Sequence, residues 1–107
     1  MKWIVTLTSR AELQLYDAAL WWAEHRSTEQ AVRWLNGFQE AIRQLSENAD
    51  RWPLALEHDH LPFDARQLVF GLGRKKTHRA IFEIRGDRVF AHLIRHLAQD
   101  SIAKDDL

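Results

Sequence analysis

The sequence predicts an α+β fold in which one strand is followed by a helical hairpin and then by a three-stranded antiparallel meander, in the order β-α-α-β-β-β. Two observations lead to this prediction. The spacing of apolar residues changes from strand-like to helical and back to strand-like along the chain. With 107 residues, of which 46% are hydrophobic, the chain can bury one modest core. We therefore expect a single domain over residues 1–107, with the helices on one face of the sheet and polar strand residues on the other.

The first strand and the first helix are predicted from the opening 25 residues. The segment "KWIVTLT" alternates and is β-branched, which indicates a strand over Lys2–Thr8. In the next segment, "SRAE", Ser9 can serve as an N-cap, and Glu12 follows three residues later, which is the spacing of a capping box. A helix to about His25 follows, because its apolar residues repeat at helical intervals: Leu13, Tyr16, Leu20 and Ala23.

The second helix begins after a short polar turn, where Ser27 or Thr28 serves as its cap. Its apolar residues recur at alternating intervals of four and three: Ala31, Leu35, Phe38, Ile42 and Leu45. The two amphipathic helices are joined closely enough to form an antiparallel hairpin. The word "ENADRWP" ends it, since Pro53 and the residue before it cannot continue a helix.

Three short runs rich in Val, Ile and Phe predict the meander, namely "RQLVFGL", "THRAIFEI" and "RVFAHLIRH". They are separated by "GRKK" and by "RGD", where Gly86 is available for a positive φ. On the middle run Arg79 shares a face with Ile81 and Glu83, and we expect Arg79 to be exposed there. The residues after the last run are too polar for more than a tail or a frayed helical turn.

The composition excludes several classes of site. The chain contains no cysteine, so disulfides, thiolate catalysis and Cys-ligated zinc are absent, and a reducing cytoplasm is the expected location. The N-terminus has no long apolar run, so we expect neither a signal peptide nor a membrane span. His58 and His60 flank Asp59, but two histidines without a third ligand nearby make a weak metal site. We expect no metal and no cofactor.

The formal net charge of zero conceals a strong asymmetry. Residues 66–99 hold eight Arg or Lys and only two acidic residues, a balance of +6, and the rest of the chain carries −6. Such crowding of like charge is used to bind an acidic partner, or is neutralised when the acidic remainder folds against it. Charge alone leaves these two interpretations equal.

The order of elements and several short words resemble the RelE/ParE superfamily of type II toxins. The resemblance covers nearly the whole chain. It depends on the order of several short sequence segments rather than on any single segment. The matching words are "VTLTSRAELQLYDAALWWAEH", "AVRWLNGFQEAIRQLSENADRWP", "DARQLVFG", "THRAIFEIRGDRVFAHLIRH" and "RHLAQD". This resemblance implies a toxin domain that inhibits growth, is encoded in a plasmid-stabilization type of system, and is neutralised by a cognate antitoxin.

The superfamily contains two activities. RelE-like members are ribosome-dependent ribonucleases that cut mRNA with a cluster of Lys and Arg and a C-terminal Tyr or His, whereas ParE-like members bind and poison DNA gyrase. If this chain were a ribonuclease, the resemblance would assign catalysis to His96, Arg79, Arg66 and Arg95. The family pattern continues after the histidine to one or two Arg, but this chain reads Leu97, Ala98, Gln99 and Asp100. The missing cation and the long helical hairpin favour the ParE-like branch, and we lean towards a binder rather than an enzyme.

Three hypotheses therefore follow from the sequence: a gyrase-binding toxin, a ribosome-dependent endoribonuclease, and a degenerate member that binds only an antitoxin. For binding we single out Arg74, Lys75, Lys76, Arg79 and Arg95. The expected partners are a cognate antitoxin and either gyrase or the ribosome, with no membrane and no stable complex with free nucleic acid. The adjacent Trp21 and Trp22 cannot face the same core line, so one is expected to pack inside and the other at an interface.

Overall fold

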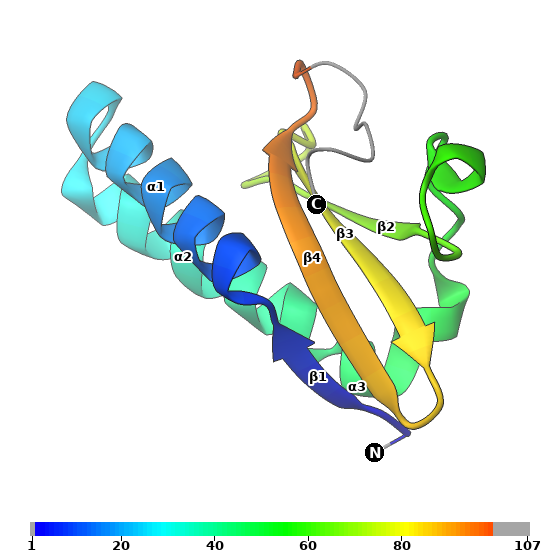
Figure 1. The fold of residues 1–107 in the computed structure, drawn as a ribbon. Helices are drawn as coiled ribbons and strands as arrows, with labels where there is room; N and C mark the ends of the chain where they lie inside the picture. The colour runs from blue at the N-terminus through cyan, green and yellow to red at the C-terminus, as the bar shows by residue number, and fades with distance from the viewer. Residues whose placement is uncertain (1, 100–107) are drawn as a thin grey trace.

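The computed structural model describes residues 2–99 as a four-stranded sheet with a helical hairpin packed on one face (Figure 1). The strands are β1 (Ile4–Leu7), β2 (Arg66–Phe70), β3 (His78–Arg85) and β4 (Arg88–His96). The hairpin consists of α1 (Ser9–His25) and α2 (Thr28–Arg43), followed by the short α3 (Leu45–Asn48) and two 3-10 turns, η1 (Ala49–Arg51) and η2 (His58–His60). The predicted α+β order is confirmed. The prediction for the C-terminal tail from residue 100 onward lies outside the described residues.

The sheet has the order β1-β4-β3-β2, so the first strand of the chain lies beside the last. β2, β3 and β4 are antiparallel neighbours, which confirms the predicted meander. β1 is parallel to β4, in a register that pairs Ile4 with Arg88 and Leu7 with Ala91. The β3–β4 turn uses Gly86 at a φ of 60°, as its sequence predicted.

The two helices begin at side-chain caps. The Oγ1 of Thr8 accepts a hydrogen bond from the backbone N–H of Ala11 at 3.2 Å, and Thr8 is still extended. Ser9, the predicted cap, is therefore already the first helical residue. The cap moves back by one residue because β1 carries the chain in extended form up to Thr8, whose own N–H bonds to the carbonyl of Ala91. Ser27 caps α2 as predicted, accepting from the N–H of Gln30 at 3.0 Å.

Helix α1 turns a different face to the core than its spacing predicted. Its buried residues are Ala11, Leu15 and Ala19, whereas Leu13 is 66% exposed and Leu20 is 60% exposed. Both lines repeat at helical intervals, so periodicity cannot separate them. The small alanines of the buried line leave room for close contact with the neighbouring elements. The bulkier line is consequently left facing outward.

Helix α2 contributes most of the core between the hairpin and the sheet. Ala31, Phe38, Ile42 and Leu45 are buried as predicted, while Leu35 is only partly buried. The sequence did not mark Trp34, which is fully buried beside Phe38 with ring centroids 5.4 Å apart. Phe38 in turn stacks on Phe70 of β2 at 5.1 Å. These rings join the hairpin to the sheet.

The opposite face of the sheet is not simply a polar surface, which corrects the prediction. The segment of residues 54–65 crosses it. The backbone N–H of Gln67 on β2 donates to the carbonyl of Pro53, just before the segment, at 3.0 Å, and the bond from Ala55 N–H to Ala65 O at 2.7 Å closes the segment on itself. A second apolar cluster is buried beneath this segment: Ala55, Leu61, Ala65, Ile81 and Leu93. The segment therefore acts as a strap over part of the sheet, and we use the name strap for residues 54–65.

Candidate functional site

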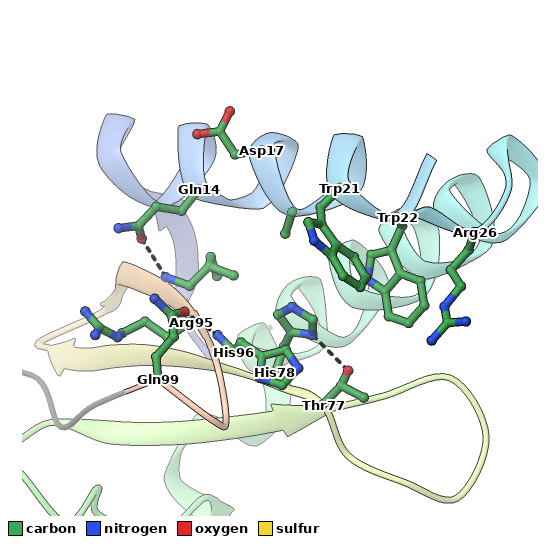
Figure 2. Close-up of a pocket in the computed structure, with 12 residues that line it drawn as sticks. Gln14, Asp17, Trp21, Trp22, Arg26, Thr77, His78, Arg95, His96 and Gln99 are labelled. Atoms are coloured by element: carbon green, nitrogen blue, oxygen red, sulfur yellow. Dashed lines mark hydrogen bonds between the residues drawn. The ribbon is translucent and has the colours of Figure 1, made fainter. Parts of the chain in front are cut away.

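A cleft of about 620 Å³ opens between the second half of α1 and the adjoining ends of β3 and β4 (Figure 2). Its walls combine aromatic rings, amides and charged groups, a mixture typical of binding sites. It is lined by Gln14, Asp17, Ala18, Trp21, Trp22, Arg26, Thr77, His78, Ile94, Arg95, His96 and Gln99. We call this feature the histidine cleft, because His78 and His96 meet within it.

Two hydrogen bonds fix the walls of the cleft. The side-chain carbonyl of Gln14 on α1 accepts from the backbone N–H of Ile94 on β4 at 2.8 Å. This bond connects the helix directly to the strand (Figure 2). On the other side, the side-chain carbonyl of Gln99 accepts from the backbone N–H of His96 at 2.7 Å. The chain after β4 is thereby held at the cleft.

His78 forms the floor of the cleft and is neutral at physiological pH. It is only 6% exposed, and its ring lies 4.8 Å from Trp34 and 4.9 Å from His96, centroid to centroid. Burial, together with the smaller effect of the neighbouring His96, lowers its pKa from 6.5 to about 4. Its Nδ1 shares a 2.8 Å hydrogen bond with the hydroxyl of Thr77. His78 thus contributes an aromatic wall rather than a positive charge.

His96 lies at the exposed end of β4. Its Nδ1 accepts a hydrogen bond from the backbone N–H of Ala98 at 3.0 Å. In the neutral ring the proton is therefore on Nε2, which makes Nε2 the donor. This geometry allows His96 to bind a partner group through Nε2, and it also matches the position at the end of the last strand that the sequence assigned to it.

The paired tryptophans separate as the sequence predicted. Trp22 is partly buried and lies 6.4 Å from Trp34 of the core, centroid to centroid. Trp21 is 48% exposed and stacks on His25 at 4.6 Å. The two indoles meet edge to face at 5.5 Å. Trp21 therefore presents a rigid aromatic surface at the rim of the histidine cleft.

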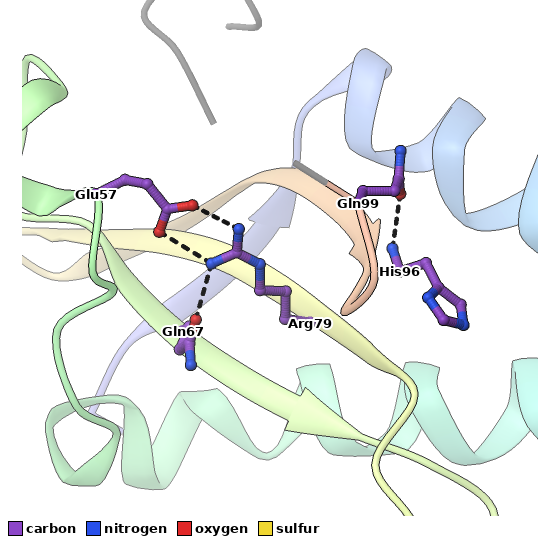
Figure 3. A network of polar contacts seen from close by, with 5 residues as sticks. All are labelled: Glu57, Gln67, Arg79, His96 and Gln99. Atoms are coloured by element: carbon purple, nitrogen blue, oxygen red, sulfur yellow. Dashed lines mark hydrogen bonds and ion pairs between the residues drawn. The ribbon is translucent and has the colours of Figure 1, made fainter. Parts of the chain in front are cut away.

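Arg79 is buried, so the prediction that it is exposed is wrong. It is 8% exposed and lies under the strap, where its guanidinium forms two bonds to the carboxylate of Glu57, at 3.0 Å and 2.5 Å (Figure 3). The side-chain carbonyl of Gln67 accepts a third bond at 3.0 Å. No local pattern predicts this arrangement, because Glu57 lies 22 positions away in an irregular segment. Arg79 is held as an internal partner of the strap.

The other basic residues singled out from the sequence lie in three places. Arg66 donates to the carbonyl of Trp52 at 2.6 Å and so holds the chain that leaves η1. Arg74, Lys75 and Lys76 are exposed at the tip of the β2–β3 hairpin. Arg95 borders the histidine cleft, but it is the register partner of Arg79 and lies between Ile94 and His96, so its side chain points to the strap side of the sheet. The positive segment is therefore partly neutralised by the acidic remainder and partly presented to solvent.

The four residues of a ribonuclease site do not converge on one point: Arg79 and Arg95 are opposite each other in the β3–β4 register, but His96 and Arg66 lie elsewhere. His96 lies against His78 on the helix side of the sheet, and Arg79 follows His78 directly on β3, so its side chain points to the other side (Figure 3). Arg66 is engaged at the far end of β2. Among residues 2–99 there is also no group of three or more His, Cys, Asp or Glu positioned to hold a metal. The cleft is thus equipped for binding an aromatic or acidic group.

This chain is similar to a known protein in structure but not in sequence. No family model matches the sequence, and no curated protein matches it either. A chain of the solved structure described as "Chromosomal ParDE TA system from P. aeruginosa" superimposes with a TM-score of 0.72. The two chains share a fold. The match covers 89% of this chain and 96% of that chain, at 16% sequence identity.

This shared fold agrees with the order of elements that the RelE/ParE resemblance implied. The α+β arrangement of strand, helical hairpin and antiparallel strands is the same in kind across nearly the whole of the neighbour's chain. Within the described part of the chain, none of the helices is both long enough and apolar enough to cross a bilayer.

Proposed function

We propose that this chain is the toxin of a type II toxin–antitoxin system, of ParE-like type, acting by binding DNA gyrase and neutralised by a cognate antitoxin. The observation that carries the proposal is the fold shared with a chain of a ParDE system over 96% of that chain. The toxin domain spans residues 1–107 and works in the cytoplasm, where gyrase and a newly made antitoxin are both present.

The arrangement of the basic residues supports binding over cleavage. Cleaving RNA requires a base, cations at the phosphorane and a proton donor within reach of one phosphate. Here Arg79 is committed to Glu57 under the strap, and His96 is on the opposite side of the sheet. A binder needs no such convergence, because its affinity is spread over a surface.

The histidine cleft and the β2–β3 hairpin tip fit an acidic, amphipathic antitoxin segment. Trp21 offers an exposed aromatic surface, and Arg26 adds positive charge to the same cleft. The hairpin tip adds three exposed cations nearby in sequence to the cleft residues Thr77 and His78. A disordered acidic tail that folds on binding can use both features together.

The experiment expresses the chain alone in bacteria, and together with the adjacent short reading frame. We expect growth arrest in the first case and, in the second, normal growth with a complex that co-purifies. Purified toxin is then incubated with gyrase and plasmid DNA, and separately with translating ribosomes. Blocked supercoiling or gyrase-dependent DNA breaks, with intact mRNA, would support the proposal.

Two other outcomes would contradict it. Codon-positioned mRNA cuts with unaffected gyrase would identify a ribosome-dependent endoribonuclease. Normal growth in the absence of the neighbour, with a co-purifying complex, would identify a degenerate member that binds only its antitoxin.

A further inference from the structure

The outward line of α1 is a continuous surface that no described element covers. Leu13 and Leu20, at 66% and 60% exposure, lie on this line, and Tyr16 beside them is 45% exposed. The opposite line of the same helix is buried in the core. A helix that is apolar on both sides is normally covered on both sides. The exposed line therefore has the character of an interface.

The residues along this line follow the spacing of a helix–helix seam. Exposed positions recur at alternating intervals of three and four: Arg10, Leu13, Asp17, Leu20 and Glu24. Alternating three and four is the pattern by which two helices pack side by side at a small angle. Figure 1 shows α1 in front of α2, with the sheet to the right of the hairpin.

We propose that a second copy of this chain packs its α1 antiparallel against this line, forming a two-fold symmetric dimer. The two-fold axis passes between positions 16 and 17. In this register Leu13 lies opposite the partner's Leu20, and the symmetry repeats the same contact at the other end. Tyr16 then lies opposite the partner's Asp17, whose carboxylate can accept a hydrogen bond from the phenol.

The charges along the seam are complementary to themselves in that register. Arg10 stands at the start of the line and Glu24 at its end, so antiparallel packing brings each Arg10 within one residue of the partner's Glu24. A second copy therefore meets opposite charge at both ends of the seam. An acidic antitoxin segment would instead meet Glu24 at the end of the seam, which is why we assign this face to a second copy.

The expected dimer is weak. Helix α1 has 17 residues, so its seam is about 25 Å long at 1.5 Å per residue. One such helix pair buries less than the roughly 1,200 Å² of a standard interface. We expect a reversible monomer–dimer equilibrium, with dissociation in the micromolar range. This inference does not depend on the proposed function, because it is measured on the purified chain alone.

The first test is sedimentation equilibrium over a range of roughly 5 to 500 µM. The wild-type chain should shift from monomer to dimer, and the double variant Leu13→Glu, Leu20→Glu should remain monomeric. Leu56→Glu is the matched control, because Leu56 is 93% exposed on the strap, away from α1. It should dimerise like the wild type. A wild type that is monomeric throughout, or a double variant that still dimerises, would overturn the proposal.

The second test examines the register. Glu24→Arg should weaken the dimer about tenfold, and combining it with Arg10→Glu should restore the wild-type dissociation constant. A single cysteine can also be placed near the axis, since the natural chain contains none. Asp17→Cys should form a disulfide-linked dimer under mild oxidation, whereas Leu56→Cys should not. Equal cross-linking of the two variants, or no restoration by the charge swap, would rule out the antiparallel register.

Discussion

The guanidinium of Arg79 and the carboxylate of Glu57 face each other in a two-bond ion pair, both groups almost completely buried between the strap and the sheet. The pair ties an irregular segment to the central strand β3. A planar guanidinium matches a carboxylate in this geometry, and Lys would not replace it. The position of the strap therefore depends on one charged contact as well as on its small apolar cluster.

Removing one member of this pair should be strongly destabilising. Glu57→Ala leaves the Arg79 charge buried, with the side-chain carbonyl of Gln67 as its remaining hydrogen-bond acceptor among residues 2–99. Breaking a buried pair in this way costs about 3–5 kcal/mol. Urea unfolding followed by tryptophan fluorescence measures the loss. Arg79→Ala should behave similarly, and a change within about 0.5 kcal/mol would show that the pair contributes little.

The exposed pair Arg43–Glu40 provides the matched control. Its atoms are 2.7 Å apart, but both side chains are more than half exposed. Glu40→Ala should therefore change the free energy of unfolding by no more than about 1 kcal/mol. The double variant Glu57→Leu, Arg79→Met should be more stable than either single truncation, because no uncompensated charge remains.

Removing the ring of Phe38 should lower the free energy of unfolding more than most other single truncations in this chain. It is fully buried and contacts rings from both the hairpin and the sheet. Phe38→Ala should cost about 3–5 kcal/mol, a large fraction of the stability of a small domain. Val32→Ala, on the same helix but 50% exposed, should stay within about 0.5 kcal/mol of wild type. Comparable losses of stability in the two variants would show that Phe38 is not a major core residue.

His78 should make the fold sensitive to acid. Its pKa is about 4 in the folded chain and near 6.5 when unfolded, so the unfolded chain binds a proton first as the pH falls. Neutral His78 therefore contributes its full stabilisation above about pH 6.5. As the pH drops towards 4 this contribution is lost, and the free energy of unfolding falls by at most roughly 3 kcal/mol. Free energies of unfolding between about pH 7.5 and 5 test this.

Two variants make that measurement specific. His78→Gln cannot titrate and should flatten the pH dependence in this interval. His60→Gln removes an exposed histidine of η2 and should leave the slope as in the wild type. A slope that survives in His78→Gln would assign the acid sensitivity to other groups.

Binding of the antitoxin should weaken as salt is added, because part of its affinity is charge complementarity. Replacing Arg74, Lys75 and Lys76 by Ser should reduce both the affinity and its salt dependence, without unfolding the chain, since all three are exposed. Calorimetric titrations at low and high salt measure both quantities. Replacing the exposed Arg33 by Ser should change neither; if it has the same effect, the hairpin tip is not the contact.

His96 distinguishes a binder from a ribonuclease. In a gyrase binder no proton is transferred, so His96→Gln should reduce growth inhibition only modestly. In a ribonuclease, loss of the proton donor should lower the cleavage rate about a hundredfold or more. Growth inhibition and mRNA cleavage are compared between the variant and wild type. An abrupt loss of mRNA cuts in His96→Gln would contradict the proposed function.

Periodicity and turn chemistry were enough to predict the order of elements. The line through Ala31, Phe38 and Ile42 identified the core face of α2, because its other faces are polar. The same method was wrong for α1, where two apolar lines compete and only packing against α2 and the sheet decides between them. A local pattern carries no information about which of two equivalent faces fits a neighbour.

The candidate site was harder to predict than the fold. Glu57 and Arg79 are 22 positions apart, and nothing in their local sequence marks them as a pair. His78 was passed over in favour of His96, although only the contact between them creates the histidine cleft. Long-range contacts between individual side chains depend on the register of the strands, which composition and spacing do not determine.

The parallel pairing of β1 with β4 affects how the chain folds during its synthesis. Val5 hydrogen-bonds within a strand pair whose other member is 84 positions away, at Val89 in the register. The first strand consequently has no neighbour to pair with until β4 has been synthesised. Closing so long a loop slows folding, whereas the helical hairpin and the β2–β3 pair can form earlier. A chain built in this way cannot form its complete surface before β4 has been added to the sheet.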